Sequence, residues 1–350
     1  MSRAADLTAL SLLPLSWRRD VAESLRGGAD PRDLLDRFIA ERPHRIQLNA
    51  SSLRSRAEAA LTRAGQRGVM PIALGDQRYP TMLTEIFDPP PVLWLRGRAS
   101  ALDAVAVAIV GSRAGSVYAL AVAERLAADL AMRGVVVVSG LARGVDSAAH
   151  RGALAAGGST IGVLGSGADI IYPAEHKSLA VEMIERGAIL SELPPGTRPL
   201  PHFFPLRNRI ISGLSRAVVV VEAGEKSGSL ITARSALDQG RDVLAVPGNV
   251  LGGRNRGGHA LLRDGAKIVE TADDILEELG FGPRPAFPSS NGETEGGDAV
   301  LGCLTPGEAC EVDQIAERCG LPIARLLPRL IDLELQGLVR RAGGGRFIRI

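Results

Sequence analysis

Lysine, aromatic residues and cysteine are all scarce in this chain. Only three of the 41 basic residues are lysine, so any basic surface has to be built from arginine. Aromatic residues make up 3% of the sequence, which leaves few side chains able to stack on a base. The three cysteines lack CxxC spacing and a His pair, which disfavours a disulfide framework or a metal site. We interpret Cys303, Cys310 and Cys319 as reduced, packed thiols of a cytoplasmic protein.

Long hydrophobic runs and a strong net charge are also missing. The apolar run near the start is short, is interrupted by Pro14 and lacks the pattern of a secretory signal. No run reaches the length of a membrane span, and the formal net charge is only +2. We therefore expect a cytoplasmic protein with no membrane partner, in which a site for a polyanion depends on local clusters of arginine.

Two nucleotide-binding fingerprints are absent. The first glycine turn of the central region is GSRAG at 111–115, which has arginine where GxGxxG has its second glycine. The next apolar run ends at Ser139 and Gly140, so the carboxylate that would hold an NAD ribose is missing. The Walker pattern GxxxxGK[ST] does not occur either. The sequence therefore predicts no dinucleotide or triphosphate cofactor, and we expect no metal.

Buried apolar runs alternate with glycine turns and amphipathic helices between about 104 and 280. Examples are AVAIV before Gly111, VVVVSG ending at Gly140 and AVVVVEAG ending at Gly224. Continuous Val and Ile runs of this kind are typical of parallel strands covered on both faces. We predict an α/β fold with a doubly wound, mostly parallel, Rossmann-like central domain, in which ligands lie at the carboxyl ends of the strands.

The flanking regions predict two smaller domains. Leucines at helical spacing predict a helical domain over 1–70, in which LPLSWRRDVAESL resembles a degenerate helix-hairpin-helix of SAM-like type without its usual glycines. The Rossmann-like domain follows over 71–281. A linker rich in Pro, Gly and Ser covers 282–297, and a helix-turn-helix pattern with a glycine-tipped hairpin over 298–350 predicts a winged helix.

Arginine clusters with phenylalanine between Glu192 and Glu222. This segment contains no lysine and no carboxylate. Arginine binds phosphate through paired hydrogen bonds, and aromatic faces stack on unpaired bases, so the pattern favours a groove for single-stranded nucleic acid. A solvated charged face stays open as the alternative, because arginine supplies nearly all the basic residues of the chain. The residues concerned are Arg198, Phe203, Phe204, Arg207, Arg209 and Arg216.

Glycine turns at the ends of predicted strands supply further groups for binding phosphate. The amides of Gly111 and Ser112 start a helix beside Arg113 and suit one backbone phosphate, although a tight turn with an ion-paired arginine is the alternative. We predict a second anion site at the start of another helix, just after Lys226. The remaining candidates are Gly140, Arg143, Gly144, Ser227, Gly228, Ser229, Arg254 and Arg256.

Several acidic and histidine residues allow a catalytic interpretation. Asp146 is expected to cap a helix, and His150 lies one turn later on the same face. We interpret the two as a structural pair and not as an acid–base dyad, because no nucleophile is evident beside them. His259 is interpreted as a turn or core residue. Glu192 and Glu222 end strands and keep open an enzymatic alternative, a Rossmann-like nucleotide phosphoribohydrolase. A winged-helix transcription regulator is the other alternative.

Taken together, the loops resemble the DNA-processing protein A family of bacteria (DprA, also called Smf). The resemblance covers the central domain and is looser in the flanks, and His176 stands where many members have asparagine. The matching segments are GSR at 111–113, SGLARGVDSAAHRGAL at 139–154, TIGVLGSGADIIYPAEHKSL at 160–179, SELPPG at 191–196, FPLRNRIISGLSRAVVVVEAGEKSGSLITARSALDQGRDVLAVPG at 204–248 and RGGHALLRDGAK at 256–267.

The resemblance implies a non-enzymatic recombination mediator. Members bind and protect single-stranded DNA, form homodimers and load the RecA recombinase during natural transformation and homologous recombination, with the flanking domains as accessories. We hypothesise that Arg113, Arg207 and Arg209 neutralise successive phosphates, while Phe204, assisted by Phe203, stacks on a base. The DNA-contacting positions of the family fall here on Gly111, Ser112, Arg113, Phe204, Arg207, Asn208 and Arg209.

Overall fold

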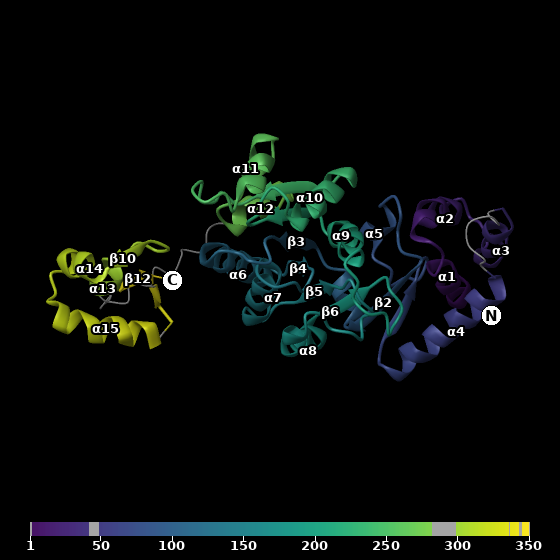
Figure 1. Ribbon diagram of the computed structural model, residues 1–350, viewed down its shortest axis with the longest axis horizontal. Coiled ribbons are helices and arrows are strands. Elements are labelled where there is room, and N and C mark those ends of the chain that lie inside the picture. Colours follow the sequence, from purple (N-terminus) through teal and green to yellow (C-terminus); the bar gives the residue numbers. More distant parts are fainter. Residues whose placement is uncertain (1, 42–48, 282–298, 336, 343–344, 350) are drawn as a thin grey trace. The chain divides into compact units, whose positions relative to one another are not determined.

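The computed structural model describes residues 2–41, 49–281, 299–335, 337–342 and 345–349 (Figure 1). Its contacts divide the chain into two compact units, Met1–Phe281 and Gly282–Ile350. The linker that the sequence predicts over 282–297 lies outside the described residues. Each unit has hydrophobic clusters of its own.

Helices form the beginning of the first unit. Leucines at helical spacing, such as Leu7, Leu34 and Leu53, are buried in one cluster together with Trp94 and Met183 of the α/β region. The helices therefore cover part of the sheet by shared apolar packing. They are α1 (Arg3–Ser11), the 3₁₀ turn η1 (Leu15–Trp17), α2 (Arg18–Arg26), α3 (Pro31–Glu41) and α4 (Ala50–Gln66).

A nine-stranded sheet forms the centre of this unit, with the order β1-β2-β6-β5-β4-β3-β7-β8-β9. All neighbours from β6 to β9 are parallel, whereas β1 and β2 add an antiparallel edge. The predicted doubly wound, mostly parallel sheet is thus confirmed. The strands are β1 (Met70–Ala73), β2 (Val92–Gly97), β3 (Ala106–Val110), β4 (Val136–Ser139), β5 (Thr160–Val163), β6 (Ala188–Ser191), β7 (Ala217–Val220), β8 (Asp242–Ala245) and β9 (Lys267–Ile268).

Helices cover both faces of the sheet (Figure 1). On β3, Val107 and Ile109 pack in one cluster with α6 (Val117–Met132) and α7 (Val145–Ala155). Ala108 and Val110 point the other way, into the cluster that contains α9 (Phe203–Gly213) and α10 (Gly228–Asp238). The other helical elements of this unit are α5 (Thr81–Thr84), η2 (Ala99–Leu102), η3 (Ala174–His176), α8 (Lys177–Arg186), α11 (Arg256–Arg263) and α12 (Ala272–Glu278).

The connectivity of the strands produces a topological switch point between β3 and β7. The chain leaves β3 into α6 on one face and leaves β7 into α10 on the other, although the two strands are neighbours. In open α/β sheets the diverging connections at such a point leave a crevice at the strand carboxyl ends, and ligands bind there.

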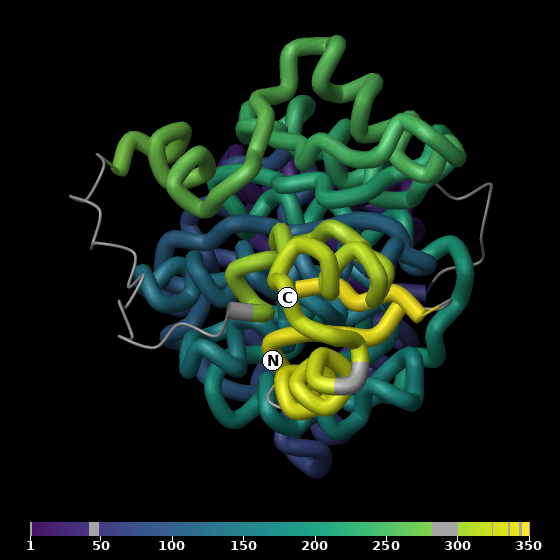
Figure 2. The backbone as a smooth tube through the Cα atoms, turned by 90° about the vertical axis from the view of Figure 1, so that its left-hand side faces the viewer, coloured from purple at the N-terminus to yellow at the C-terminus, as the bar shows by residue number. Residues whose placement is uncertain are grey.

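The second unit is a winged helix, as predicted (yellow-green to yellow in Figure 2). Ile315, Leu326, Leu330 and Phe347 are buried together in its core. Its strands form an antiparallel sheet in the order β10-β12-β11. The elements are α13 (Ala299–Gly302), β10 (Ala309–Glu311), α14 (Val312–Cys319), α15 (Ile323–Leu335), β11 (Val339–Ala342) and β12 (Arg346–Arg349).

Candidate nucleic-acid interface

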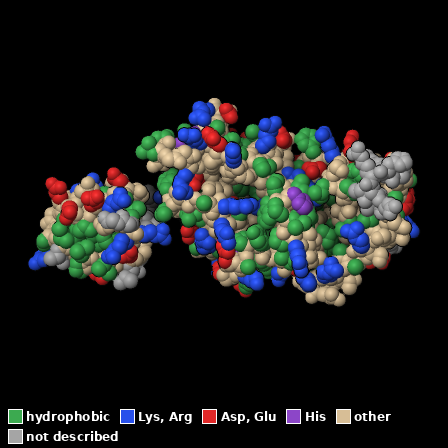
Figure 3. All heavy atoms as spheres, in the orientation of Figure 1, with side chains coloured by type: hydrophobic (Ala, Val, Ile, Leu, Met, Phe, Trp, Pro, Cys, Tyr) green, Lys and Arg blue, Asp and Glu red, His purple; other side chains and the backbone are tan. Residues whose placement is uncertain are grey.

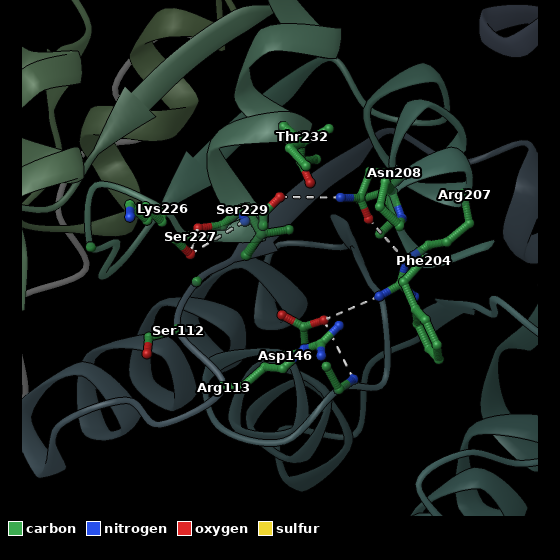
Figure 4. Close-up of a pocket in the computed structure, with 18 of the residues that line it drawn as sticks. Ser112, Arg113, Asp146, Phe204, Arg207, Asn208, Lys226, Ser227, Ser229 and Thr232 are labelled. Carbon is green, nitrogen blue, oxygen red and sulfur yellow. Dashed lines mark hydrogen bonds and ion pairs between the residues drawn. The ribbon is translucent and has the colours of Figure 1, made fainter. Parts of the chain in front are cut away.

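A pocket of about 550 Å³ opens at the switch point, at the carboxyl ends of β3 and β7 (Figure 4). Its walls are the turn after β3, the first turns of α9, and the turn after β7 that leads into α10. The residues that the sequence predicts and the structure brings together here are Gly111, Ser112, Arg113, Phe204, Arg207, Asn208, Lys226, Ser227, Gly228 and Ser229.

Helix α10 begins at this pocket. Its N-cap is Ser227, whose side chain accepts a hydrogen bond from the amide of Ser229. The first turn of α10 therefore directs the positive end of its helix dipole toward the pocket, whereas the start of α6 lies outside the lining and already holds the carboxylate of Glu222. Main-chain polarity alone makes this place favourable for an anion.

Arg113 and Lys226 supply positive charge to the pocket. Among the residues that the structure describes, neither side chain forms an ion pair with a carboxylate. The guanidinium of Arg113 lies 5.4 Å from the centre of the Phe204 ring, a cation–π contact. A cation–π contact needs no carboxylate, so the charge of Arg113 stays available for a phosphate.

Tyr172 is an aromatic neighbour of the pocket that the sequence interpretation did not single out. Its ring centre lies 5.5 Å from that of Phe204 and the ring is 49% exposed. The scarcity of aromatic residues was the signal that could have identified it. Phe203, by contrast, does not line the pocket and packs on His202 with ring centres 4.2 Å apart.

Arg207 lines the pocket but is buried and bonded to groups of the protein, so its contact with a phosphate stays a prediction. Its Nη1 donates to the carbonyl oxygens of Gly140, at 2.6 Å, and of Val163, while Nη2 lies 4.0 Å from a carboxylate oxygen of Asp146. Burial lowers the pKa of Arg207 to about 10, with Asp146 opposing that shift. The side chain fixes α9 to the ends of β4 and β5 and is not free to leave them.

Arg209 is also engaged by groups of the protein. It pairs with Asp88 at 3.0 Å and Glu192 at 2.6 Å, and its side chain is only 11% exposed. Arg18 of α2 contributes a second cation to Glu192, at 3.1 Å. The fold thus brings Glu192 and Asp88 to a segment that has no carboxylate of its own, and the contact of Arg209 with a phosphate stays a prediction. The FPLRNR segment at 204–209 lies in the first turns of α9.

The turn around Gly140 and Gly144 has a packing role. Gly144 has a φ of 77°, and a Cβ there would lie 2.3 Å from the carbonyl oxygen of Ser112. A Cβ on Gly140 would lie 2.1 Å from Nη2 of Arg207. Arg143 lies outside the pocket lining and pairs with Glu175 at 2.5 Å. Gly140, Arg143 and Gly144 therefore lie outside the pocket lining, and the two glycines allow close packing next to it.

Asn208 and the loop after β8 complete the set of predicted residues. Asn208 lines the pocket and donates to the carbonyl oxygen of Gly228 at 3.2 Å, which joins α9 to α10. Arg254 is exposed and donates to the carbonyl oxygen of Ala114 at 3.1 Å. Arg256 lies 3.7 Å from a carboxylate oxygen of Glu225.

The expected pair of Asp146 and His150 does not form. Asp146 accepts hydrogen bonds from the amides of Gly140 and Ala142, ahead of a helix whose N-cap is Gly144, so it closes the turn rather than capping. Burial raises its pKa, and Arg207 opposes this. Nδ1 of His150 bonds instead to the Thr160 hydroxyl at 2.7 Å. Burial, with a smaller contribution from Arg207, lowers the pKa of His150 to about 3.

The two glutamates considered as catalytic groups have structural partners. Glu192 is held by two arginines, as described above. Glu222 accepts hydrogen bonds from the amide of Ser116 at 3.1 Å and from its hydroxyl at 2.6 Å, at the start of α6. Both carboxylates therefore fix local structure.

Charge is mixed over the surface of the first unit. Figure 3 shows basic side chains interspersed with hydrophobic and acidic ones on the face turned to the viewer. Within the described ranges, no helix combines the length and apolar character that a bilayer crossing requires. In the same residues, no group of three or more His, Cys, Asp or Glu side chains is placed to hold a metal ion.

Comparison with known proteins gives consistent matches over both units. A family model described as DNA recombination-mediator protein A matches residues 71–280, and a DprA winged helix domain model matches 283–345. Protein Smf of Escherichia coli is 41% identical over 78% of this chain and 75% of its own length. DNA processing protein DprA of Bacillus subtilis is 40% identical over 72% of this chain and 87% of its own.

Two solved structures extend the likeness to the fold. DNA processing protein A of Streptococcus pneumoniae has 36% identity and a TM-score of 0.68, covering 79% of this chain and 98% of that one. The Helicobacter pylori protein has 30% identity and a TM-score of 0.55 over 60% of this chain and 95% of its own, and its structure describes a single-stranded DNA binding mode of that protein. The chain belongs to the DNA processing protein A (DprA/Smf) family.

Proposed function

We propose that this chain binds single-stranded DNA in the pocket between β3, β7 and α9. The observation that carries the proposal is the placement of Arg113 and Lys226, both without an ion pair among the described residues, in one pocket with the Phe204 ring and the start of α10. Phosphate needs cations and amide donors, and an unpaired base needs an aromatic face. The single-stranded DNA binding mode described for the Helicobacter pylori relative supports the same ligand.

The proposed mechanism assigns different tasks to the arginines. Arg113 and Lys226 neutralise backbone phosphates, with the amides of Gly111 and the start of α10 as further donors. The amide of Ser112 already donates to the carbonyl oxygen of Glu222 at 2.7 Å. Phe204, with the Tyr172 ring beside it, stacks on a splayed base. Arg207 and Asn208 hold α9 in place. Since none of these groups selects a base edge, binding is expected to tolerate any sequence.

A non-enzymatic role fits this site better than catalysis. The phosphoribohydrolase alternative requires Glu192 or Glu222 to act on a substrate, but ion pairs with Arg18 and Arg209 engage the first, and hydrogen bonds from Ser116 engage the second. We therefore propose binding without turnover. Incubation with nucleoside monophosphates should release no free base.

We further propose that the chain acts as a recombination mediator in the cytoplasm. In this role it protects incoming single strands, works as a homodimer and loads RecA in natural transformation and homologous recombination. Support comes from the family model, described as a DNA recombination-mediator protein, and from relatives named DNA processing protein DprA. A dimer would place two pockets on one strand and increase avidity.

A competition titration of the full chain tests the binding proposal. Fluorescently labelled oligo-dT is bound first, and unlabelled single strands or duplex of the same length then compete. The single strand should compete at much lower concentration. Preference for the duplex, unchanged by Arg113→Ala, would instead favour a transcription regulator acting through the winged helix. RecA filament formation on the bound oligonucleotide, with and without the protein, tests the mediator role separately.

A further inference from the structure

Two hydrogen bonds connect the start of α6 with the loop over 247–256, beside the pocket. The Tyr118 hydroxyl donates to the carbonyl oxygen of Pro247 at 3.2 Å. In the opposite direction, Nη1 of Arg254 donates to the carbonyl oxygen of Ala114 at 3.1 Å. Ala114 itself lines the pocket. The loop therefore adjoins the turn after β3 that lines the pocket.

A buried amide fixes this loop at its base. Asn255 is only 2% exposed; its Oδ1 accepts from the amide of Ala223 at 3.0 Å, and its Nδ2 donates to the carbonyl oxygen of Val246 at 3.2 Å. Nε2 of His259 bonds to the carbonyl oxygen of Gly248 at 3.0 Å. Since the residue next to Arg254 is held at the ends of β7 and β8, the arginine starts from a fixed position. Such preorganisation lowers the entropy lost on binding.

Both side chains keep a surface that the protein does not use. Tyr118 is 49% exposed although its hydroxyl is anchored. Arg254 is exposed and, within the described part of the chain, forms no ion pair with a carboxylate. The neighbouring Arg256 differs, because it lies within ion-pair distance of Glu225.

We infer that Tyr118 and Arg254 extend the single-strand site beyond the pocket. Arg254 binds the backbone phosphate that follows those held by Arg113, and Tyr118 stacks on the next base. The site then has an aromatic ring at each end, Phe204 and Tyr118, with cations between them. This inference rests on the proposed function and names the path that the strand takes out of the pocket.

The test measures affinity as a function of oligonucleotide length. Fluorescence anisotropy is recorded for oligo-dT from about 4 to about 16 nucleotides, a range that brackets common single-strand site sizes. The full-length wild type is compared with Tyr118→Ala, Tyr118→Phe and Arg254→Ala. The matched control is Arg125→Ala, also on α6, whose side chain is 82% exposed and pairs with Asp129.

The expected result is a loss that depends on length. Tyr118→Ala and Arg254→Ala should weaken the longest oligonucleotides about fivefold or more and leave the shortest unchanged, because these do not reach beyond the pocket. Tyr118→Phe keeps the ring and should stay within about twofold of the wild type. 2-Aminopurine is placed at successive positions of the strand, and stacking on Tyr118 should quench its fluorescence at one of them. This quenching should be lost in Tyr118→Ala only.

Three results would overturn the inference. Wild-type affinity of both variants for every length would show that the strand leaves the pocket elsewhere. Equal losses at all lengths, including the shortest, would show that the substitutions distort the pocket. If the wild type binds no single strand at all, the proposed function itself fails, and this outcome is distinct from the first two.

Discussion

The guanidinium of Arg113 lies over the ring of Phe204, 5.4 Å from its centre. This contact positions the arginine without an acidic partner, which separates it from Arg207 and Arg209. A cation–π contact costs the guanidinium little of its hydrogen-bonding capacity. Arg113 is therefore the side chain whose removal should tell most about the site.

Arg113→Ala should weaken oligo-dT binding about tenfold and reduce the slope of log affinity against log salt by about 0.7, the value for one neutralised phosphate of a single strand. Anisotropy titrations at several salt concentrations measure both quantities. Arg125→Ala removes an equally exposed charge outside the pocket and should change neither. Identical effects of the two substitutions would mean that general electrostatics, not this pocket, binds the strand.

Phe204→Leu should weaken binding by about 1–3 kcal/mol, because a base loses its aromatic neighbour while most of the apolar volume remains. Phe204→Trp is the control and should bind within about threefold of the wild type, since it offers a larger π face. The same titration gives the result. Undiminished affinity of the leucine variant would remove stacking from the mechanism.

Arg207→Met should lower the free energy of unfolding by about 3 kcal/mol, because buried Asp146 loses its cation and two carbonyl groups lose a donor. Urea denaturation measures the change, and Arg113→Ala should leave stability within about 0.5 kcal/mol of the wild type. A fully stable Arg207→Met protein that has lost affinity would support the original hypothesis of a direct phosphate contact.

Buried His150 predicts that acid destabilises the fold. Burial lowers its pKa from 6.5 to about 3. Between these values the unfolded chain binds more protons, so the free energy of unfolding falls as the pH drops below about 6.5, by about 2 kcal/mol at about pH 5.

Urea denaturation at about pH 7.5 and about pH 5 tests this prediction. His150→Asn keeps an N–H donor toward Thr160 but cannot titrate, so its stability should fall less between the two pH values. Equal losses in the variant and the wild type would assign the acid sensitivity to other groups.

The sheet and its turns could be predicted because their signals are local. Runs such as AVAIV before Gly111 specify buried strands, and the residues after them have to lie at the carboxyl edge. The state of each arginine could not be predicted in this way. Asp88, Glu175 and Glu192 reach their arginines from other parts of the chain, and only the folded structure separates paired cations from unpaired ones.

Part of the attraction for phosphate resides in the main chain, where α10 begins at the pocket. Substituting side chains around the rim leaves these peptide dipoles in place. Charge-removing variants should consequently keep a residual, salt-sensitive affinity. The side chains around the pocket can therefore change without removing the preference of the pocket for negatively charged ligands.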